Sequence, residues 1–134
     1  MPSFDLATHT SAPVEEVWKL LHDPARFPEW WAGIETVQPG TGSEYTMWTQ
    51  GYPDFPIAHR MATDVGGGRV TISCLVSDLE YRWQLGEHGT GTDIAVQVDL
   101  PEAEAARLPV QRELLTRSIA RLAELAAASG DGSA

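Results

Sequence analysis

Apolar and polar residues alternate along most of this chain, a pattern that predicts an antiparallel β-sheet with one buried face and one solvated face. In the clearest case, Val70, Ile72, Cys74 and Val76 share one side of a strand. Alternation and strand-favouring composition predict seven strands, at about residues 3–10, 33–37, 44–50, 57–65, 69–76, 81–86 and 92–100. Turns rich in glycine join consecutive strands at 39–42 and 66–68, so neighbouring strands are expected to pair as hairpins.

Two segments carry apolar residues at helical spacing instead. A short helix with one buried face is predicted by residues at i, i+3, i+4 and i+7, namely Val14, Val17, Trp18 and Leu21. Asp23-Pro24 ends this helix, because the residue before a proline is pushed out of the α region. A longer helix from Pro109 onward is predicted to cover the sheet with Leu115, Ile119, Leu122 and Ala126. Residues 101–108 are expected to form a separate helical turn.

Several motifs then follow one another in a characteristic order. A polar strand enters Ala12-Pro13, a helix contains Val17-Trp18, and an aromatic segment ends at Trp30-Trp31. Gly91-Thr92 opens a late strand, and a long C-terminal helix completes the chain. This order resembles the helix-grip (SRPBCC) superfamily, which includes START lipid-transfer domains, Bet v 1-type allergens and bacterial polyketide cyclase/dehydrase-like proteins. The resemblance implies an α+β helix-grip fold: a curved seven-stranded antiparallel sheet wrapped around the C-terminal helix, two short helices after the first strand, and a cavity between sheet and helix.

Length, charge and cysteine content limit the number of domains, the kinds of partner and the cellular compartment that are expected. A chain of 134 residues fits one domain, here 1–128, followed by a flexible tail at 129–134 that lacks large apolar residues. The net charge of −10 disfavours nucleic-acid binding. No run of apolar residues is long enough to insert into a membrane, and Cys74 is alone, so a cytoplasmic protein without disulfides is expected. We expect a monomer or a homodimer.

His59 is the best candidate for chemistry inside the cavity. If Met61 faces inward, alternation places His59 on the same side. One interpretation is a histidine satisfied by a backbone carbonyl; the other is a general acid or base, since imidazole titrates near neutrality. Tyr45 and Tyr81 are the candidate partners in such chemistry. His9, His22 and His88 show no metal-binding spacing, so neither a metal site nor a cofactor is expected.

The expected cavity lining combines the inward faces of the strands with the stripe of the last helix. On the strand at 44–50 two faces are open: one carries Tyr45, Met47 and Thr49, the other Thr46, Trp48 and Gln50. Aromatic residues on these strands suit either core packing or a pocket for a flat, partly oxygenated ligand. The candidate ligand-binding residues are Trp48, His59, Met61, Ile72, Cys74, Tyr81, Trp83, Ile94, Val96, Leu115 and Ile119.

Three functions are compatible with this pattern. The favoured one is binding of a small hydrophobic molecule, aromatic, polyketide-like or lipid-like, in the cavity. The alternative is a polyketide cyclase/dehydrase of the aromatase type, in which His59 and a tyrosine act as acid and base. A protein-interaction module is the third. The dry face predicted for this sheet is nearly all apolar around one histidine, which favours binding over catalysis.

Overall fold

Seven strands form one antiparallel sheet in the computed structural model, which describes residues 2–51, 54 and 56–132. The order across the sheet is β1-β7-β6-β5-β4-β3-β2, so every neighbouring pair except β1 and β7 is consecutive in the chain. The strands are β1 (Ser3–Thr10), β2 (Ile34–Pro39), β3 (Glu44–Thr49), β4 (Ile57–Asp64), β5 (Arg69–Cys74), β6 (Glu80–His88) and β7 (Gly91–Asp99). The predicted sheet is confirmed, with strand ends that differ by at most two residues.

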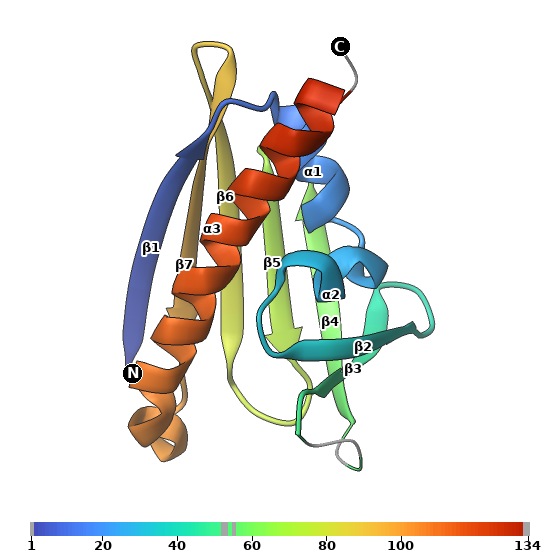
Figure 1. Cartoon of the computed structure of the whole chain (residues 1–134). Helices are drawn as coiled ribbons and strands as arrows, with labels where there is room; N and C mark the ends of the chain where they lie inside the picture. The colour runs from blue at the N-terminus through green and yellow to red at the C-terminus, as the bar shows by residue number, and fades with distance from the viewer. Residues whose placement is uncertain (1, 52–53, 55, 133–134) are drawn as a thin grey trace.

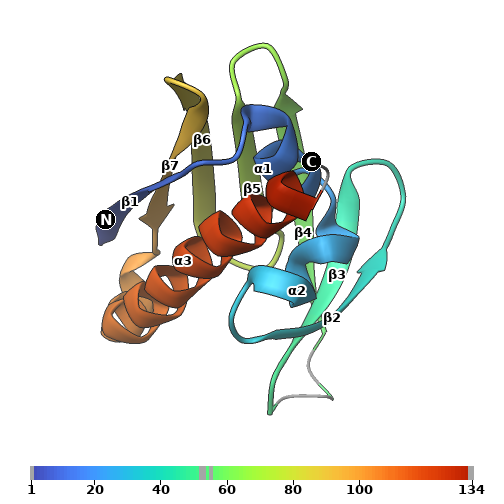
Figure 2. The ribbon, with the colours of Figure 1, turned by 45° about the horizontal axis from the view of Figure 1, so that its top comes forward.

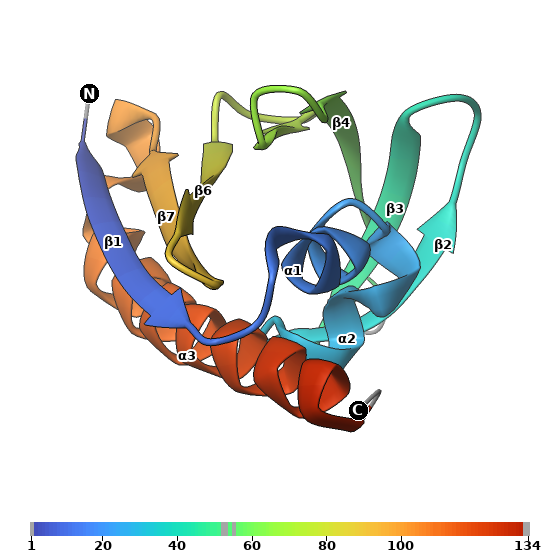
Figure 3. The same ribbon diagram turned by 90° about the horizontal axis from the view of Figure 1, so that it is seen from above.

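The helices lie on the inner side of this sheet. They are α1 (Val14–Leu21), α2 (Phe27–Trp30) and the long α3 (Leu108–Gly132), with 3₁₀ turns at η1 (Pro24–Arg26) and η2 (Glu102–Arg107). Figure 1 shows α3 running diagonally across the sheet, and Figure 2 shows α1 and α2 beside the C-terminal half of α3. Seen from above, the sheet curves from β1 around to β2, and α3 lies across the open side (Figure 3). The predicted helix-grip architecture is therefore confirmed.

The stripe predicted on α3 faces the interior. The buried residues of its described side chains recur at helical spacing: Leu115, Ser118, Ile119, Leu122, Ala123 and Ala126. Ser118 is the polar member, and its Oγ accepts a hydrogen bond of 2.8 Å from the backbone N–H of Ala32. Five residues further along α3, the carbonyl of Ala123 accepts a hydrogen bond of 2.8 Å from Thr10 Oγ1. These two bonds fix α3 against β1 and against the segment that follows α2.

The first helix is rotated relative to the sequence-based expectation. Val17, Leu20 and Leu21 are fully buried, whereas Val14 and Trp18 are only partly buried. Trp18 stacks on His22 with ring centroids 5.6 Å apart. Because α1 is wedged between α3 and the sheet, its buried face is centred on Leu20 and Leu21, and the bulky Trp18 lies at the edge of that face.

Aromatic side chains fill the centre of the space between α3 and the sheet. Phe27, Trp30 and Trp31 are all buried, and Trp31 contacts Trp83 of β6 edge-on at 5.6 Å between centroids. The Trp30 indole N–H donates to the carbonyl of Leu20 across 3.0 Å, which satisfies its polar group. The expected cavity between the sheet and α3 is therefore smaller than the whole space between them. Packed rings occupy the middle, because burying large aromatic surfaces is strongly favourable.

The end of α3 lies beyond the boundary that composition predicts. The helix runs to Gly132, whereas the sequence suggests a loose tail from residue 129; residues 133 and 134 lie outside the described part. A single domain over 1–128 with a flexible tail stays a prediction. None of the helices in the described part of the chain is both long and apolar enough to cross a membrane.

Candidate functional site

A pocket of about 430 Å³ lies at one end of the interior, where β3 to β6 meet η2 and the start of α3. Phe27, Trp30 and Trp31 are not among the residues that line it. We call it the His59 pocket. Its lining residues are Met47, Thr49, Ile57, His59, Cys74, Val76, Ser77, Leu79, Tyr81, Glu104, Arg107 and Gln111.

His59 is positioned by the inward face of β4. It pairs with Tyr45 on β3 and Cys74 on β5, and only 1% of it is exposed. Its ring lies over that of Tyr45, with centroids 5.6 Å apart and planes 15° apart. Its Nδ1 lies 3.2 Å from the carbonyl oxygen of Ile57. A carbonyl only accepts, so Nδ1 carries the proton and Nε2 keeps a lone pair.

The protonation of His59 follows from burial. Desolvation lowers the pKa of His59, and its hydrogen bond to Ile57 offsets this only in part. The imidazole is therefore neutral near neutral pH. Its N–H bonds to a backbone carbonyl, as expected for a histidine satisfied within the core. Its Nε2 remains an acceptor, which a general base requires.

Tyr81 places a hydroxyl at the same pocket. It is buried on β6, and its Oη donates to Oε1 of Gln111 on α3 across 3.3 Å. Burial raises the pKa of Tyr81 well above its usual range, so the phenol keeps its proton. The pocket thus holds a neutral hydrogen-bond donor and a neutral acceptor on neighbouring parts of its wall.

The rim carries an ion pair that sequence reasoning missed. Arg107 Nη1 donates to Glu104 Oε1 across 3.3 Å, and the other carboxylate oxygen, Oε2, is buried without a hydrogen-bond partner among the described residues. Glu104, Arg107 and Gln111 stand at i, i+3 and i+7, which puts them on one side of a continuous helical path. This spacing could have indicated from the sequence that the three residues lie together. Because residues 101–108 are expected to form only a separate helical turn, the sequence provides no reason to examine that spacing.

Tyr45 belongs to a different hollow. It is buried, its hydroxyl has no hydrogen-bond partner in the described part of the chain, and burial raises its pKa far above the usual range. It lines a cleft of about 310 Å³ together with Met61 and the segment 22–25. Of the three residues proposed for catalysis, only His59 and Tyr81 therefore share one pocket.

The structure divides the predicted ligand-binding residues into several groups. His59, Cys74 and Tyr81 line the His59 pocket. Met61 lines the Tyr45 cleft. Six residues expected at the cavity are buried in the packed core instead: Ile72, Trp83, Ile94, Val96, Leu115 and Ile119. Each of these six residues is at most 5% exposed.

Trp48 is placed on the wrong side by the prediction. The structure resolves the phase of β3: Tyr45 and Met47 are buried, and Trp48 is half-buried beside β2, in a shallow hollow lined by Glu35, Thr36, Val37 and Gln38. Met47 and Thr49, from the face that carries Tyr45, take the place at the His59 pocket that Trp48 was expected to fill.

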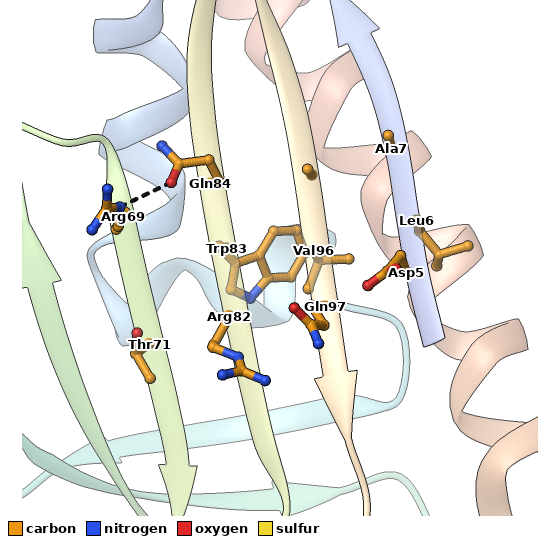
Figure 4. A pocket seen from close by; sticks show the side chains of 11 residues that line it. Asp5, Leu6, Ala7, Arg69, Thr71, Arg82, Trp83, Gln84, Val96 and Gln97 are labelled. Atoms are coloured by element: carbon orange, nitrogen blue, oxygen red, sulfur yellow. Dashed lines mark hydrogen bonds between the residues drawn. The ribbon is translucent and has the colours of Figure 1, made fainter. Parts of the chain in front are cut away.

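The outer face of the sheet has a broad depression of about 460 Å³ (Figure 4). Its polar side chains come from β1, β5, β6 and β7, and several of them bond to neighbouring groups of the sheet. Arg69 Nε donates to Gln84 Oε1 across 3.0 Å, and Arg82 pairs with Asp99. This depression lies on the solvated side of the sheet, whereas the His59 pocket lies on the buried side, between the sheet and the start of α3.

Comparison with known proteins supports the architecture. The family model "Polyketide cyclase / dehydrase and lipid transport" matches residues 10–123. No curated protein matches the chain. Among solved structures, protein NE0264 from Nitrosomonas europaea superposes with a TM-score of 0.73 at 17% identity, covering 92% of each chain. TTHA0849 from Thermus thermophilus gives a TM-score of 0.70 at 13% identity, covering 99% of each chain.

A third similar structure is a larger protein. The di-domain ARO/CYC protein BexL from the BE-7585A biosynthetic pathway superposes with a TM-score of 0.75 at 15% identity. The match covers 92% of this chain and 46% of BexL, so the chain spans about half of that protein. At such identities the likeness establishes the fold alone.

Proposed function

Because this chain belongs to the polyketide cyclase/dehydrase and lipid transport family, we propose that it binds one small, largely apolar molecule carrying a hydroxyl or carbonyl group in the His59 pocket. The observation that carries this proposal is the placement of His59 and Tyr81 in one pocket. The apolar part of its wall is formed by Met47, Ile57, Cys74, Val76 and Leu79. A volume of about 430 Å³ lies within the roughly 300–1,000 Å³ of small-molecule sites.

The polar groups determine which ligands fit. The one hydroxyl proton of Tyr81, now donated to Gln111, can turn to a ligand oxygen that replaces Gln111 as acceptor. The Nε2 of His59 accepts, and Oε2 of Glu104 is a buried acceptor without a donor among the described residues. A ligand hydroxyl can donate to one acceptor and accept from Tyr81, which a hydrocarbon cannot do. A flat, aromatic or polyketide-like molecule with a phenolic or enolic hydroxyl is therefore the class that we favour.

A matched pair of probes tests this proposal. Naphthalene and 2-naphthol differ only by a hydroxyl, and calorimetry gives their affinities and stoichiometry. We expect 2-naphthol to bind one-to-one and more tightly, by about the 1 kcal/mol that one net hydrogen bond contributes. Tyr81→Phe should remove most of that preference and leave naphthalene binding unchanged.

A second pair of variants locates the binding. Val76 lines the pocket and Val65 lies in the distant β4–β5 turn, and both are 74% exposed. Val76→Glu should weaken both probes and Val65→Glu neither. Equal effects of the two substitutions would refute binding in the His59 pocket, and failure of both probes to bind would favour a protein-interaction module.

The second candidate function is a cyclase/dehydrase reaction at the same pocket. It is favoured by the neutral His59 with a free Nε2 lone pair beside a protonated Tyr81. In this scheme Nε2 removes an acidic α-proton from a bound β-ketone, and the Tyr81 hydroxyl donates to the enolate oxygen that forms. The enolate carbon attacks a second ketone of the chain, and the alkoxide that forms takes the proton held on His59. Neutral Nε2 then removes a second α-proton and delivers it to the hydroxyl, which leaves as water while the C=C bond forms.

Turnover separates the two candidates. If the protein is an enzyme, it should cyclise a poly-β-ketone mimic well above the buffer rate. His59→Gln should then reduce turnover by roughly 100-fold or more, with little effect on binding. If it is a carrier, wild-type protein should bind the mimic without accelerating its cyclisation.

A further inference from the structure

Three potential metal ligands meet on the outer face of the sheet, at the end opposite the His59 pocket. His9 lies near the end of β1, His88 ends β6, and Asp93 lies near the start of β7. His9 Nδ1 is 2.9 Å from Asp93 Oδ1, and His88 Nδ1 is 3.0 Å from Asp93 Oδ2. The two imidazole centroids are 5.4 Å apart. We call this group the His9–His88–Asp93 cluster.

The strands hold the cluster in place. His9 is the direct cross-strand partner of Asp93, and His88 pairs with Gly91 at the β6–β7 turn. Gly91 leaves room for the ring of His9, because a Cβ there would lie 3.0 Å from its Cε1 and Nε2 and 2.3 Å from the carbonyl oxygen of Thr10. Both histidines are therefore presented on paired backbone segments with little freedom to separate.

The donor set suits a transition metal. Two imidazole nitrogens and one carboxylate oxygen are ligand types that Zn²⁺ and Co²⁺ accept. A neutral imidazole can move its proton from Nδ1 to Nε2, which turns the Nδ1 lone pair toward a cation. The three ligand atoms lie within 4.8 Å of one another. Atoms bound at about 2.0–2.1 Å around a tetrahedral Zn²⁺ are roughly 3.4 Å apart, so small side-chain movements suffice.

We propose that His9, His88 and Asp93 bind one divalent transition-metal ion, such as Zn²⁺ or Co²⁺, and thereby link β1 to the β6–β7 hairpin. All three side chains are at least half exposed, so water completes the coordination. Sequence reasoning expected no metal, because His9 and Asp93 are 84 residues apart and only β1–β7 pairing unites them. This site is independent of the proposed ligand pocket.

Calorimetry with ZnCl₂ on tag-free, chelator-treated protein tests the proposal, with Co²⁺ absorption as a second readout. We expect one ion per chain. His9→Ala and His88→Ala should each raise the dissociation constant by at least the roughly 10–100-fold typical for loss of an outer-shell partner. The control is His22→Ala, since His22 is also exposed but bonds to and stacks on Trp18, outside the cluster. It should leave the affinity unchanged.

Nitrogen-15 NMR of the wild-type imidazoles provides a readout that needs no variant. On adding Zn²⁺, the Nδ1 resonances of His9 and His88 should shift and those of His22 and His59 should not. Two results would overturn the proposal: no one-to-one binding by wild-type protein, or one-to-one binding that persists in both His9→Ala and His88→Ala.

Discussion

The indole of Trp31 meets the ring of Tyr81 edge-on, with centroids 5.0 Å apart and ring planes at 90°. Trp31 belongs to the aromatic segment that fills the centre of the molecule, and Tyr81 is a wall of the His59 pocket. This contact is therefore the boundary between the packed interior and the space left for a ligand. It explains why the pocket lies at one end of α3.

Removing the boundary should enlarge the pocket. Trp31→Ala is expected to destabilise the fold by about 3–5 kcal/mol, because it deletes a buried aromatic ring. It should also shift the preference from two-ring toward three-ring hydroxyarenes, measured as the ratio of their calorimetric affinities. Trp48→Ala, on the other face, should leave that ratio unchanged. An unaltered ratio in a folded Trp31→Ala protein would show that Trp31 does not bound the pocket.

Trp30 and Trp18 should differ in their contribution to stability. Trp30 is fully buried and its N–H is bonded to Leu20, whereas Trp18 is partly exposed and stacks on His22. In urea denaturation, Trp30→Ala should cost about 3–5 kcal/mol and Trp18→Ala clearly less. Equal losses would contradict the observed phase of α1.

Ser118 should matter for the docking of α3. Ser118→Ala leaves the buried N–H of Ala32 without its acceptor, at an expected cost of about 1–3 kcal/mol. Thr116 provides the matched control, because its hydroxyl also bonds to a carbonyl four residues earlier but is exposed. If Thr116→Ala lowers the free energy of unfolding as much as Ser118→Ala does, the Ser118–Ala32 bond contributes nothing specific.

His59 should make stability depend on pH. Its pKa is lower in the folded state than the unfolded value of 6.5, so the unfolded chain binds more protons between these two values. The free energy of unfolding therefore carries no penalty from His59 above pH 6.5. It decreases as the pH falls from 6.5 toward the pKa of His59 in the folded state. Urea midpoints at about pH 7.5 and about pH 5 should show a smaller drop for His59→Gln than for wild type, while His22→Gln keeps the full drop. A histidine NMR titration that places His59 at or above 6.5 would contradict this prediction.

The sequence determines the strands and helices but not how the interior is divided. Val70, Ile72 and Cys74 alternate so regularly that their inward phase could be predicted. On β3, both faces carry aromatic residues, so Tyr45 and Trp48 could be assigned only from pairing with β2 and β4. Adjacent Trp30 and Trp31 are costly to expose to water, but no local pattern shows that they occupy the centre of the predicted cavity.

The part of the candidate site that lies on β4 could be predicted, because inward and outward side chains alternate along a strand. His59 was placed inward because it shares a face with Met61, and it is indeed buried. Glu104 and Gln111 face the same pocket from η2 and α3, and that meeting depends on how the C-terminal helix crosses the sheet. Such a crossing is set by tertiary packing, which local periodicity does not encode.

The most direct test is to locate 2-naphthol on the protein by intermolecular nuclear Overhauser effects. The proposed function predicts contacts from its ring protons to Ile57 and Leu79, which line the His59 pocket, and none to Ile94 or Leu115, which lie in the packed interior. Contacts to Ile94 and Leu115, or contacts confined to the outer face of the sheet, would contradict the claim that the His59 pocket is the binding site.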